Sequence, residues 1–517
     1  MADDRDGETV PGRHPTVTDM TRPASSAIPL WQEQARQLLS ELRATRDALL
    51  HESERRMAQW EPVIHRESFR ASAVNLADWL ALRRMDLTAL QPRLTEFGLS
   101  TLGRLDGHVR PSVDAVIAAL AVLAGEPEPE FPSPEAIRGE RALLDARRDE
   151  LFGAGTDGPL TRVMVTLPSE AADDPGLIRD LVAAGMDCVR INCAHDGPEA
   201  WLKMIGHVRL AATEAARRIP VSMDLGGPKF RIESVSKDHK HHFLPGDRFA
   251  IAGTLADGPQ KTIRATLSHP ALLEALAVGA EISVDDGKLW AKVVDRPNSH
   301  ALLEVTRAPA KGMRLKPEKG VNLPGSDLRV TALTEDDIAA LDVVVTEADM
   351  VSYSFVQTVE DIRTLIAEME KRAAGRRMPA IILKIETPLG LRNLPDLIVE
   401  AGGRLPVGVM IARGDLAVEI GFERLSEIQE EILWLCEAAQ VPVIWATQVL
   451  EGMVRDGQAT RAEVTDAAMS QRAECVMLNK GPHVVEAVRF LRGILGRMDR
   501  HQMKKSARLV QLKAWGG

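Results

Sequence analysis

The chain has 517 residues, of which 45% are hydrophobic and 27% charged, and its formal net charge is -10 at pH 7. This length predicts two to three domains, because a single hydrophobic core rarely grows beyond about 250–300 residues. The negative net charge argues against a nucleic-acid partner. No apolar run has the length of a membrane span. The four cysteines form no CxxC pair and the N-terminus lacks an apolar signal segment, so we expect a cytoplasmic protein with reduced thiols.

The first part of the chain is predicted to be helical. Residues 1–28 are polar and rich in Pro, Asp, Arg and Thr, which predicts a disordered tail. From 29 to 125, leucines recur at helical spacing, which predicts an all-α domain. A Pro- and Glu-rich segment, GEPEPEFPSPEA, then opens a linker with one short helix at 126–158.

From residue 161 onward, short β-rich apolar runs alternate with amphipathic helices. The eight runs are TRVMVT, DCVRIN, IPVSMD, ADMVSYSF, PAIILK, PVGVMI, VPVIWA and ECVMLN, beginning at residues 161, 187, 219, 348, 379, 406, 441 and 474. Eight strand-plus-helix units predict the α/β class and a (β/α)8 TIM barrel rather than an open sheet. The barrel is expected at 159–228 and 326–500, with a C-terminal tail at 501–517.

One long interval, residues 229–325, separates the third and fourth runs. It contains DRFAIAG, KTIRATL, AEISVDDGKLWAKVVD and HALLEVTRA, separated by turn sequences. This pattern predicts a small antiparallel, β-barrel-like domain inserted after barrel strand three. Because active sites of such barrels lie at the C-terminal ends of the strands, the insert is well placed to act as a lid.

Charged residues gather where the predicted barrel strands end. Glu386 and Asp415 follow strands five and six, and two carboxylates with room for water suit Mg2+ or Mn2+. Lys384 lies two residues before Glu386 and points to the same side of an extended strand, and Arg190 ends strand two. Gly414 allows backbone N–H groups to approach an anion at a helix start. The combination suits phosphoryl transfer or stabilisation of an enolate.

Several ordered motifs resemble those of the pyruvate kinase family. They are RINCAHDG, MDLGGPKFR, VDDG, KGVNLPG, KIET, ARGDLAVEI, ATQVLEGM and TRAEVTDAA, and they extend over residues 161–490 or so. The resemblance implies a barrel with a β insert after strand three and the reaction of phosphoenolpyruvate with ADP to give pyruvate and ATP. An N-terminal helical domain is expected here, without the family's C-terminal regulatory domain.

The resemblance also implies roles for individual residues. Glu386 and Asp415 are expected to hold Mg2+ or Mn2+, and Lys384 to stabilise the phosphoryl group during transfer. Thr447 is expected near the enolate carbon that gains a proton. The implied substrate-binding residues are Arg190, Ser354, Gly414, Asp415 and Thr447. The residues implied to lie near the ADP or ATP co-substrate are Thr166, Pro168, Asn192, His195, Arg231 and Lys319.

Departures from the family pattern concern the K+ site. Members usually bind K+ through an Asn, a Ser, an Asp and a Thr. Asn192 and Asp224 are kept here, but Ala194 and Leu225 stand at the hydroxyl positions, and Lys229 replaces the usual Glu of the GPE motif. We infer that the ammonium of Lys229, with Asn192 and Asp224, substitutes for K+, and we expect activity that does not require this ion.

Further departures keep a second function open. The segment TLPSEA is one Gly shorter than the usual TIGPAS, Gly226 replaces the Lys of TKG, and NKGPH at 479–483 replaces SGETA. One alternative is a repurposed relative that uses phosphoenolpyruvate or pyruvate enolate with another acceptor, as a kinase or as a lyase or aldolase. Another is a non-catalytic regulatory scaffold, although a scaffold predicts loss of the metal carboxylates, which are retained. We expect a homo-oligomer, with neither a membrane nor a nucleic acid as partner.

Overall fold

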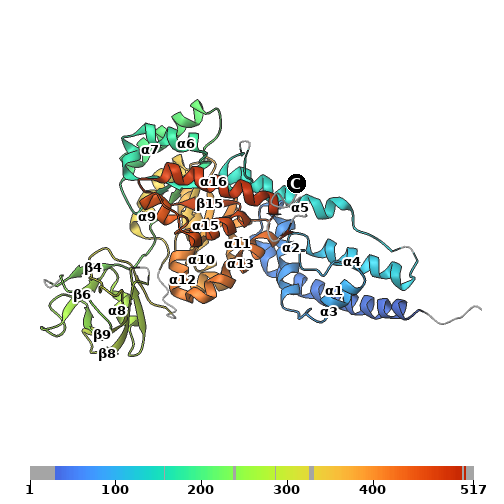
Figure 1. Ribbon diagram of the computed structural model, residues 1–517, viewed down its shortest axis with the longest axis horizontal. Coiled ribbons are helices and arrows are strands. Elements are labelled where there is room, and N and C mark those ends of the chain that lie inside the picture. The colour runs from blue at the N-terminus through green and yellow to red at the C-terminus, as the bar shows by residue number, and fades with distance from the viewer. Residues whose placement is uncertain are drawn as a thin grey trace, which may run out of the picture.

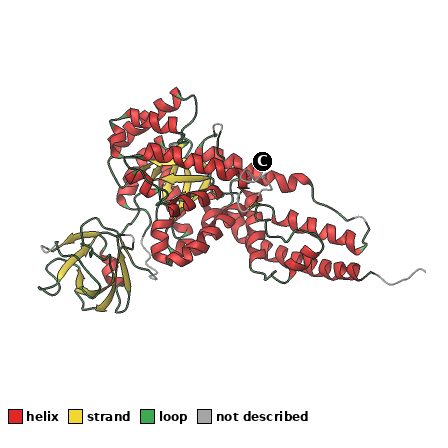
Figure 2. Ribbon diagram, viewed as in Figure 1, coloured by secondary structure: helices red, strands yellow, loops and turns green. Residues whose placement is uncertain are grey.

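The computed structural model describes residues 29–127, 129–155, 158–236, 240–285, 287–324, 331–503 and 506–507. The tail predicted at 1–28 lies outside them. A closed barrel occupies the middle of the molecule, with the N-terminal helices on one side and a separate β domain on the other (Figure 1). Among the described residues, strands lie in the barrel, the β domain and a short hairpin near the C-terminus. The N-terminal part is helical (Figure 2). The predicted fold class is therefore confirmed.

The N-terminal helices pack through the leucines that the spacing singled out. They are α1 (Leu30–Trp60), α2 (Glu67–Arg83), α3 (Leu90–Glu96) and α4 (Val109–Ala124), with the 3-10 turn η1 (Glu61–Val63). Leu38, Leu42 and Leu49 of α1 are fully buried. The helix that follows, α5 (Pro134–Phe152), has 19 residues and is longer than the short helix predicted for the linker. It begins where Ser133 caps it by accepting a hydrogen bond from the N–H of Ala136.

All eight predicted runs form barrel strands, and every neighbouring pair is parallel. The ring closes in the order β1-β15-β14-β13-β12-β11-β3-β2. The strands are β1 (Arg162–Thr166), β2 (Cys188–Asn192), β3 (Val221–Asp224), β11 (Met350–Tyr353), β12 (Ala380–Ile385), β13 (Val407–Ala412), β14 (Val443–Ala446) and β15 (Cys475–Leu478). Each is buried along almost its whole length, as expected for strands covered by helices outside and side chains inside.

Helices surround the barrel and close one end of it. The outer ring consists of α6 (Pro175–Ala184), α7 (Pro198–Glu214), α9 (Glu335–Glu347), α10 (Val359–Ala373), α11 (Pro388–Gly402), α12 (Arg413–Ile420), α13 (Phe422–Ala438), α14 (Glu451–Asp456), α15 (Arg461–Met469) and α16 (Val484–His501), with the turns η2 (Ser169–Ala172) and η3 (Ser470–Arg472). Inside, Met164, Ile382 and Met410 form one apolar cluster with Leu151 and Phe152 of α5. The helix that precedes the barrel therefore fills the end of the cylinder opposite the candidate site.

The inserted domain is a curled seven-stranded sheet in the order β10-β7-β8-β9-β5-β6-β4. Its elements are β4 (Ile232–Val235), β5 (Arg248–Ala252), β6 (Ile263–Leu267), α8 (Pro270–Ala275), β7 (Glu281–Val284), β8 (Leu289–Asp295), β9 (His300–Arg307) and β10 (Val321–Asn322). An isolated bridge between Arg231 and Gly320 joins the chain beside the two edge strands, which makes the sheet barrel-like. The expectation of a wholly antiparallel domain is wrong for β5 and β6, which pair in parallel. The connection 253–262 carries the chain back along β5 before β6 begins.

The N-terminal helices are joined to the barrel by buried hydrogen bonds. Arg147 of α5 donates to the hydroxyl of Ser72 on α2 at 2.9 Å and to the carbonyl of Gln440, after α13, at 2.9 Å. The ring of Phe69 lies against Gly402, where a Cβ would be 2.6 Å from the ring. Among the described residues, no helix is long and apolar enough to cross a membrane.

The C-terminal tail predicted at 501–517 is described only in part. Helix α16 extends to His501, and β16 (Gln502–Met503) pairs antiparallel with β17 (Ser506–Ala507). The other residues of that range lie outside the described chain.

Candidate active site

The charged residues at the barrel mouth have the same inward orientation as the apolar interior. Cys188 of β2 and Ile382 of β12 belong to the interior cluster. Because strand side chains alternate, Arg190 also points inward two residues later, and so do Lys384 and Glu386. The alternation that fills the barrel with apolar side chains thus ends, at the C-terminal edge, in a set of charged ones.

Lys384 lies at the centre of this set. Its Nζ is 3.0 Å from Oδ1 of Asp224, 2.6 Å from Oγ of Ser354 and 3.4 Å from Oε1 of Glu386. The hydroxyl of Ser354 in turn donates to the carbonyl of Leu225 at 2.7 Å, so it accepts the bond from Lys384. Burial lowers the pKa of Lys384, but Asp224 and Glu386 outweigh it and raise the pKa above its usual value. The amine is therefore charged at neutral pH.

Arg190 is positioned by two neighbours that leave part of its guanidinium available. Its Nε donates to Oδ2 of Asp224, and one terminal nitrogen donates to Oγ1 of Thr166 at 3.1 Å. Burial raises the pKa of Asp224, but Arg190 and Lys384 more than offset this and hold it below its usual value. Within the described chain, the other terminal nitrogen of Arg190 makes no hydrogen bond, so it remains a donor for a bound anion.

The two carboxylates expected to hold a metal lie close enough to affect each other. Oε2 of Glu386 accepts the N–H of Phe355 at 2.6 Å. Burial raises the pKa of Glu386, and Asp415 raises it further, against the opposing effect of Lys384. A divalent cation would relieve this unfavourable charge, so the donor chemistry fits Mg2+ or Mn2+. In the described ranges no three His, Cys, Asp or Glu side chains form a group that could hold a metal ion.

Lys229 reaches the same site from the first residues of the inserted segment. Its Nζ donates to Oδ1 and Oδ2 of Asp415, at 3.0 and 3.2 Å. The sequence led us to infer that this ammonium acts together with Asn192 and Asp224, and that stays a prediction. Asp224 is contacted by Arg190 and Lys384. The contacts of Lys229 with Asp415 put its charge beside one of the two carboxylates expected to hold the metal.

The start of α12 and the turn after β14 are held together. Oγ1 of Thr447 accepts the N–H of Gly414 at 2.7 Å, and Thr447 has a left-handed backbone with φ of 65°. Arg413 fixes that turn by donating to the carbonyls of Ala446 and Thr447, at 3.0 and 2.8 Å, while it pairs with Asp466. The sequence analysis did not select Asp466 as a site residue. It lies in the family-like motif TRAEVTDAA, which could have indicated it.

The positive charges of Lys480 and Arg231 act on His195, on the side implied to face the nucleotide, and we call these three residues the basic cluster. Burial lowers the pKa of His195, and the nearby charges of Lys480 and Arg231 lower it further. His195 and Arg231, both implied to lie near the nucleotide, are thus near enough for their charges to interact, and so is Lys480; a role of these residues in nucleotide binding stays a prediction. Lys480 belongs to the segment NKGPH, and its departure from the usual family motif was the only sequence feature that pointed to this residue.

The other implied nucleotide residues have local partners. Oδ1 of Asn192 accepts the N–H of Ala194 at 3.2 Å. Pro168 lies immediately before the turn η2. Lys319 pairs with Asp285 at 2.9 Å inside the inserted domain. Asn192 and Pro168 therefore lie beside the ends of barrel strands, whereas Lys319 lies in the inserted domain.

The entrance to the inserted domain is attached to the barrel. Oδ1 of Asp337, in the first turn of α9, accepts the N–H of Gly226 at 2.8 Å. Gly227 has φ of +66°, and a Cβ there would lie 2.8 Å from Cβ of Ser354. On the other side, Asn322 of β10 donates to Glu419 of α12 at 3.1 Å, and burial raises the pKa of Glu419 to about 7. Both ends of the insert thus connect to elements that carry the site.

Comparison with known proteins agrees with this architecture. The family described as pyruvate kinase, barrel domain, matches residues 159–486. The pyruvate kinase of Methylorubrum extorquens is 35% identical over 358 residues, covering 68% of this chain and 71% of that protein. Pyruvate kinase 2 of Trypanosoma brucei brucei is 34% identical over 322 residues, covering 61% of this chain and 62% of that protein. The pyruvate kinase of Mycobacterium tuberculosis is 31% identical over 342 residues, covering 65% of this chain and 69% of that protein. The barrel, its insert and the matched sequence together show that the chain belongs to the pyruvate kinase family.

Proposed function

We propose that this chain transfers a phosphoryl group between phosphoenolpyruvate and ADP, giving pyruvate and ATP, with Mg2+ or Mn2+ as cofactor. Its relatives carry the name of this kinase, and its family is one of phosphotransferases. The observation that supports the proposal most is the contact of a charged, buried Lys384 with Glu386, 3.4 Å apart, beside Asp415 and Arg190.

The chain's own residues supply positioned positive charge. Lys384 and Arg190 are held by Asp224, so neither needs to reorganise when negative charge develops on a transferring phosphoryl group. A divalent cation held by Glu386 and Asp415 would neutralise substrate oxygens. The N–H of Gly414 is bonded to Thr447, and the N–H groups that follow it in the first turn of α12 favour a carboxylate at that position. Thr447 lies against Gly414 and is the neighbour suited to a proton transfer at the enolate carbon.

The nucleotide is proposed to bind at the basic cluster. His195, Arg231 and Lys480 offer donors and positive charge to phosphates, and the inserted domain contributes Arg231. Movement of that domain would then bring the nucleotide phosphates toward Lys384. Thr166, Pro168, Asn192 and Lys319 are the other residues proposed for this side.

We also propose that K+ is not required. A tethered ammonium within 3.0 Å of Asp415 supplies a permanent positive charge at the site. Ala194 and Leu225, which stand at two usual K+-ligand positions, provide no side-chain oxygen. Lys229, which contacts Asp415, is therefore the group proposed to replace the ion's charge.

A coupled assay with phosphoenolpyruvate, ADP and Mg2+ tests the reaction. Lys384→Met and Glu386→Gln should each lower kcat by about a hundredfold or more, because each removes charge acting on the transferring group. Glu347→Gln, which changes a partly exposed carboxylate of α9 paired with Arg209, is the matched control and should leave kcat unchanged. Wild-type-like turnover in both site variants would refute the proposed chemistry.

The altered segment NKGPH supports one alternative, an acceptor other than ADP. Lys480 places an additional cation beside His195 where the usual family motif carries a Ser and a Glu. A wild-type protein that binds phosphoenolpyruvate with Mg2+ but shows no turnover with ADP would favour this alternative kinase or aldolase-type use of the enolate. We further propose a cytoplasmic homo-oligomer, which light scattering of the purified protein and fractionation of cells would check.

A further inference from the structure

The turn that carries Thr447 has a strained backbone. Thr447, Gln448 and Leu450 have φ of 65°, 56° and 49°, so three residues other than glycine adopt the left-handed conformation close together. Their side chains make this conformation unfavourable, and such strain persists only where surrounding contacts impose it. The turn follows β14 directly, at the C-terminal edge of the barrel. Contacts with neighbouring elements therefore decide its shape.

Arg413, the first residue of α12, binds this turn from one side. Its guanidinium donates to the carbonyls of Ala446 and Thr447, at 3.0 and 2.8 Å. The same group lies over the ring of Trp445, 4.6 Å from the ring centroid. Because the guanidinium is planar and its donors point in fixed directions, its orientation determines whether it reaches both carbonyls.

Asp466 of α15 sets that orientation. One oxygen of its carboxylate pairs with Nη1 of Arg413 and the other accepts from Nη2 at 2.8 Å, so the ion pair is bidentate. The first oxygen also accepts the indole N–H of Trp445, at 3.3 Å. A second carboxylate of α15, that of Glu463, accepts the N–H of Gly452 just after the turn. Helix α15 is thus connected to the chain before and after the turn.

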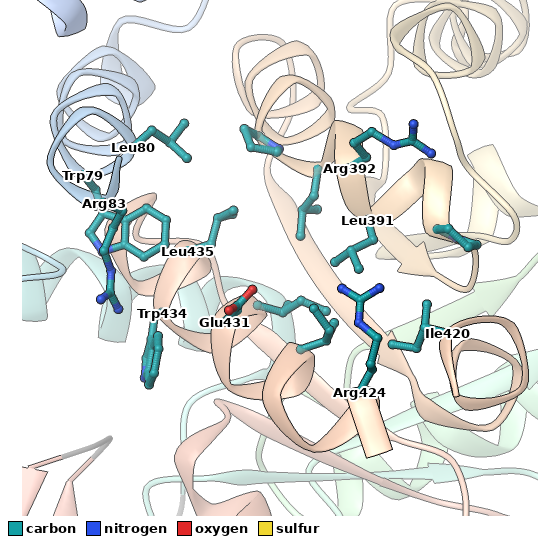
Figure 3. A pocket seen from close by; sticks show the side chains of 15 residues that line it. Trp79, Leu80, Arg83, Leu391, Arg392, Ile420, Arg424, Glu431, Trp434 and Leu435 are labelled. Carbon is teal, nitrogen blue, oxygen red and sulfur yellow. The ribbon is translucent and has the colours of Figure 1, made fainter. Parts of the chain in front are cut away.

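Packing does not fix α12 along its whole length. Its last residue, Ile420, borders a cavity of about 720 Å3 that lies between α2, α11 and α13 (Figure 3). The lining of this cavity is mostly apolar and includes three arginines, Arg83, Arg392 and Arg424. A side chain that faces such a space lacks partner atoms on that side, so it holds the helix less firmly. The contacts of Arg413 at the opposite end of α12 are therefore important for the position of this helix.

The shape of the turn determines where the hydroxyl of Thr447 points. Its oxygen accepts the N–H of Gly414 at 2.7 Å, and in the described part of the chain its own O–H donates to no protein group. This O–H is therefore available at the barrel mouth, beside the helical turn that contains Asp415. A change of the backbone out of the left-handed conformation would redirect the Cα–Cβ bond and move the hydroxyl.

We propose that Asp466 is a positioning residue, which acts through Arg413 to hold the turn in its left-handed conformation and so orients the hydroxyl of Thr447 for proton transfer. In that step the methylene carbon of pyruvate enolate forms a C–H bond with the proton of this hydroxyl, and the oxygen of Thr447 regains a proton from water. The use of the hydroxyl in catalysis rests on the proposed function, whereas its positioning by Asp466 does not.

Exchange of the methyl protons of pyruvate for deuterium tests the catalytic part, because it requires the enolate but not ADP. In D2O with Mg2+ and ATP, followed by proton NMR, Asp466→Asn should slow this exchange by about tenfold or more, as expected for a misplaced catalytic group. The KM for phosphoenolpyruvate in the coupled assay should stay the same.

Thr447→Ala should also slow the exchange, and adding Asp466→Asn to it should have no further effect, because Asp466 acts through that hydroxyl. Asp456→Asn, which changes an exposed carboxylate of α14 paired with Arg455, is the matched control and should exchange at the wild-type rate. No slowing by Asp466→Asn, or the same slowing with and without the hydroxyl of Thr447, would overturn the catalytic part.

A crystal structure of Asp466→Asn tests the positioning itself, independently of any reaction. We expect Thr447 and Gln448 to leave the left-handed region, and Oγ1 of Thr447 to lie beyond about 3.5 Å from the nitrogen of Gly414, outside hydrogen-bond range. Arg413→Lys keeps the positive charge but not the planar fork and should alter the turn in the same way. An unchanged turn in both variants would overturn the proposal.

The two experiments separate this inference from the proposed function. Exchange by the wild type without turnover of phosphoenolpyruvate and ADP would refute only the proposed function. A wild type that shows neither exchange nor turnover would refute the use of the Thr447 hydroxyl in catalysis, and the crystal structures would still decide whether Asp466 positions it.

Discussion

The ammonium of Lys229 donates hydrogen bonds to both carboxylate oxygens of Asp415, at 3.0 and 3.2 Å. Lys229 precedes the first strand of the inserted domain, and Asp415 lies in the first turn of α12. One contact therefore connects the position of the inserted domain to the charge of Asp415, a carboxylate proposed to hold the divalent cation. This geometry links the proposed independence of K+ to a specific pair of side chains.

The first prediction concerns K+. Wild-type turnover should be the same in K+ and in tetramethylammonium salts, because the charge of Lys229 is part of the chain. Lys229→Gln should lower kcat/KM by about tenfold or more in both salts, since it removes a charge-assisted contact at the site. Lys288→Gln, which changes an exposed lysine paired with Asp285, is the matched control and should retain activity. A strong requirement of the wild type for K+ would contradict the prediction.

The second prediction concerns the entrance to the inserted domain. Gly227→Ala should lower kcat/KM by about tenfold, because its added Cβ meets Ser354 and Phe355 at 2.8 and 2.9 Å in a left-handed backbone conformation. Ser354 is hydrogen-bonded to Lys384, so the displacement reaches the central amine.

Gly246→Ala separates the effect of contact with Ser354 and Phe355 from the effect of a left-handed backbone conformation. Gly246 also has a positive φ, +93°, but a Cβ there meets nothing within 4 Å. This control should cost about 1 kcal/mol of stability and leave kcat/KM unchanged. Equal losses of activity in the two variants would show that contact with Ser354 is not the cause.

The third prediction concerns the packing of the N-terminal helices on the barrel. Gly402→Ala should lower the free energy of unfolding by about 1–3 kcal/mol, because its Cβ would lie 2.6 Å from the ring of Phe69. Gly493→Ala in α16, where nothing lies within 4 Å, should be neutral or stabilising by up to about 1 kcal/mol. Urea titration followed by circular dichroism measures both, and adding Phe69→Leu to Gly402→Ala should recover part of the loss.

The fourth prediction concerns Glu140 of α5 and the dependence of stability on pH. Burial raises the pKa of Glu140 to about 8, and its Oε2 has no hydrogen bond in the described chain. In the unfolded chain a Glu has a pKa of about 4.3, so between these values the folded protein holds the extra proton. The protonated Glu140 therefore contributes its full stabilisation below the pKa of the unfolded chain. This contribution is lost as the pH rises through about 8, the pKa in the folded protein.

Melting temperatures of Glu140→Gln and the wild type at pH 5 and pH 9 test this. The variant should lose less stability than the wild type between the two pH values, because its amide stays neutral. Glu135→Gln, at an exposed position of the first turn of the same helix, should have the wild-type pH dependence. The same pH dependence in Glu140→Gln and wild type would contradict the raised pKa.

Local patterns in the sequence were sufficient to predict the barrel and the charged residues at the C-terminal ends of its strands. Each of the eight runs is long enough and apolar enough to be a buried strand, and the alternation of side chains along a strand is a property of the backbone. That alternation alone orients Arg190, Lys384 and Glu386 inward, at the end of the barrel where the strands finish. The motifs around these residues then identified the family that the comparisons show.

Other features depended on how distant segments pack. Lys229 and Asp415 are 186 positions apart, Arg413 and Asp466 are 53 apart, and the charge of Lys480 acts on His195 from the opposite end of the barrel sequence. The parallel pairing of β5 with β6 and the arginine-lined cavity between α2, α11 and α13 were equally absent from any local pattern. Periodicity specifies which face of an element is buried but not which other element covers it. The sequence by itself therefore determined the barrel and the orientation of its charged residues, and the tertiary structure decided their partners.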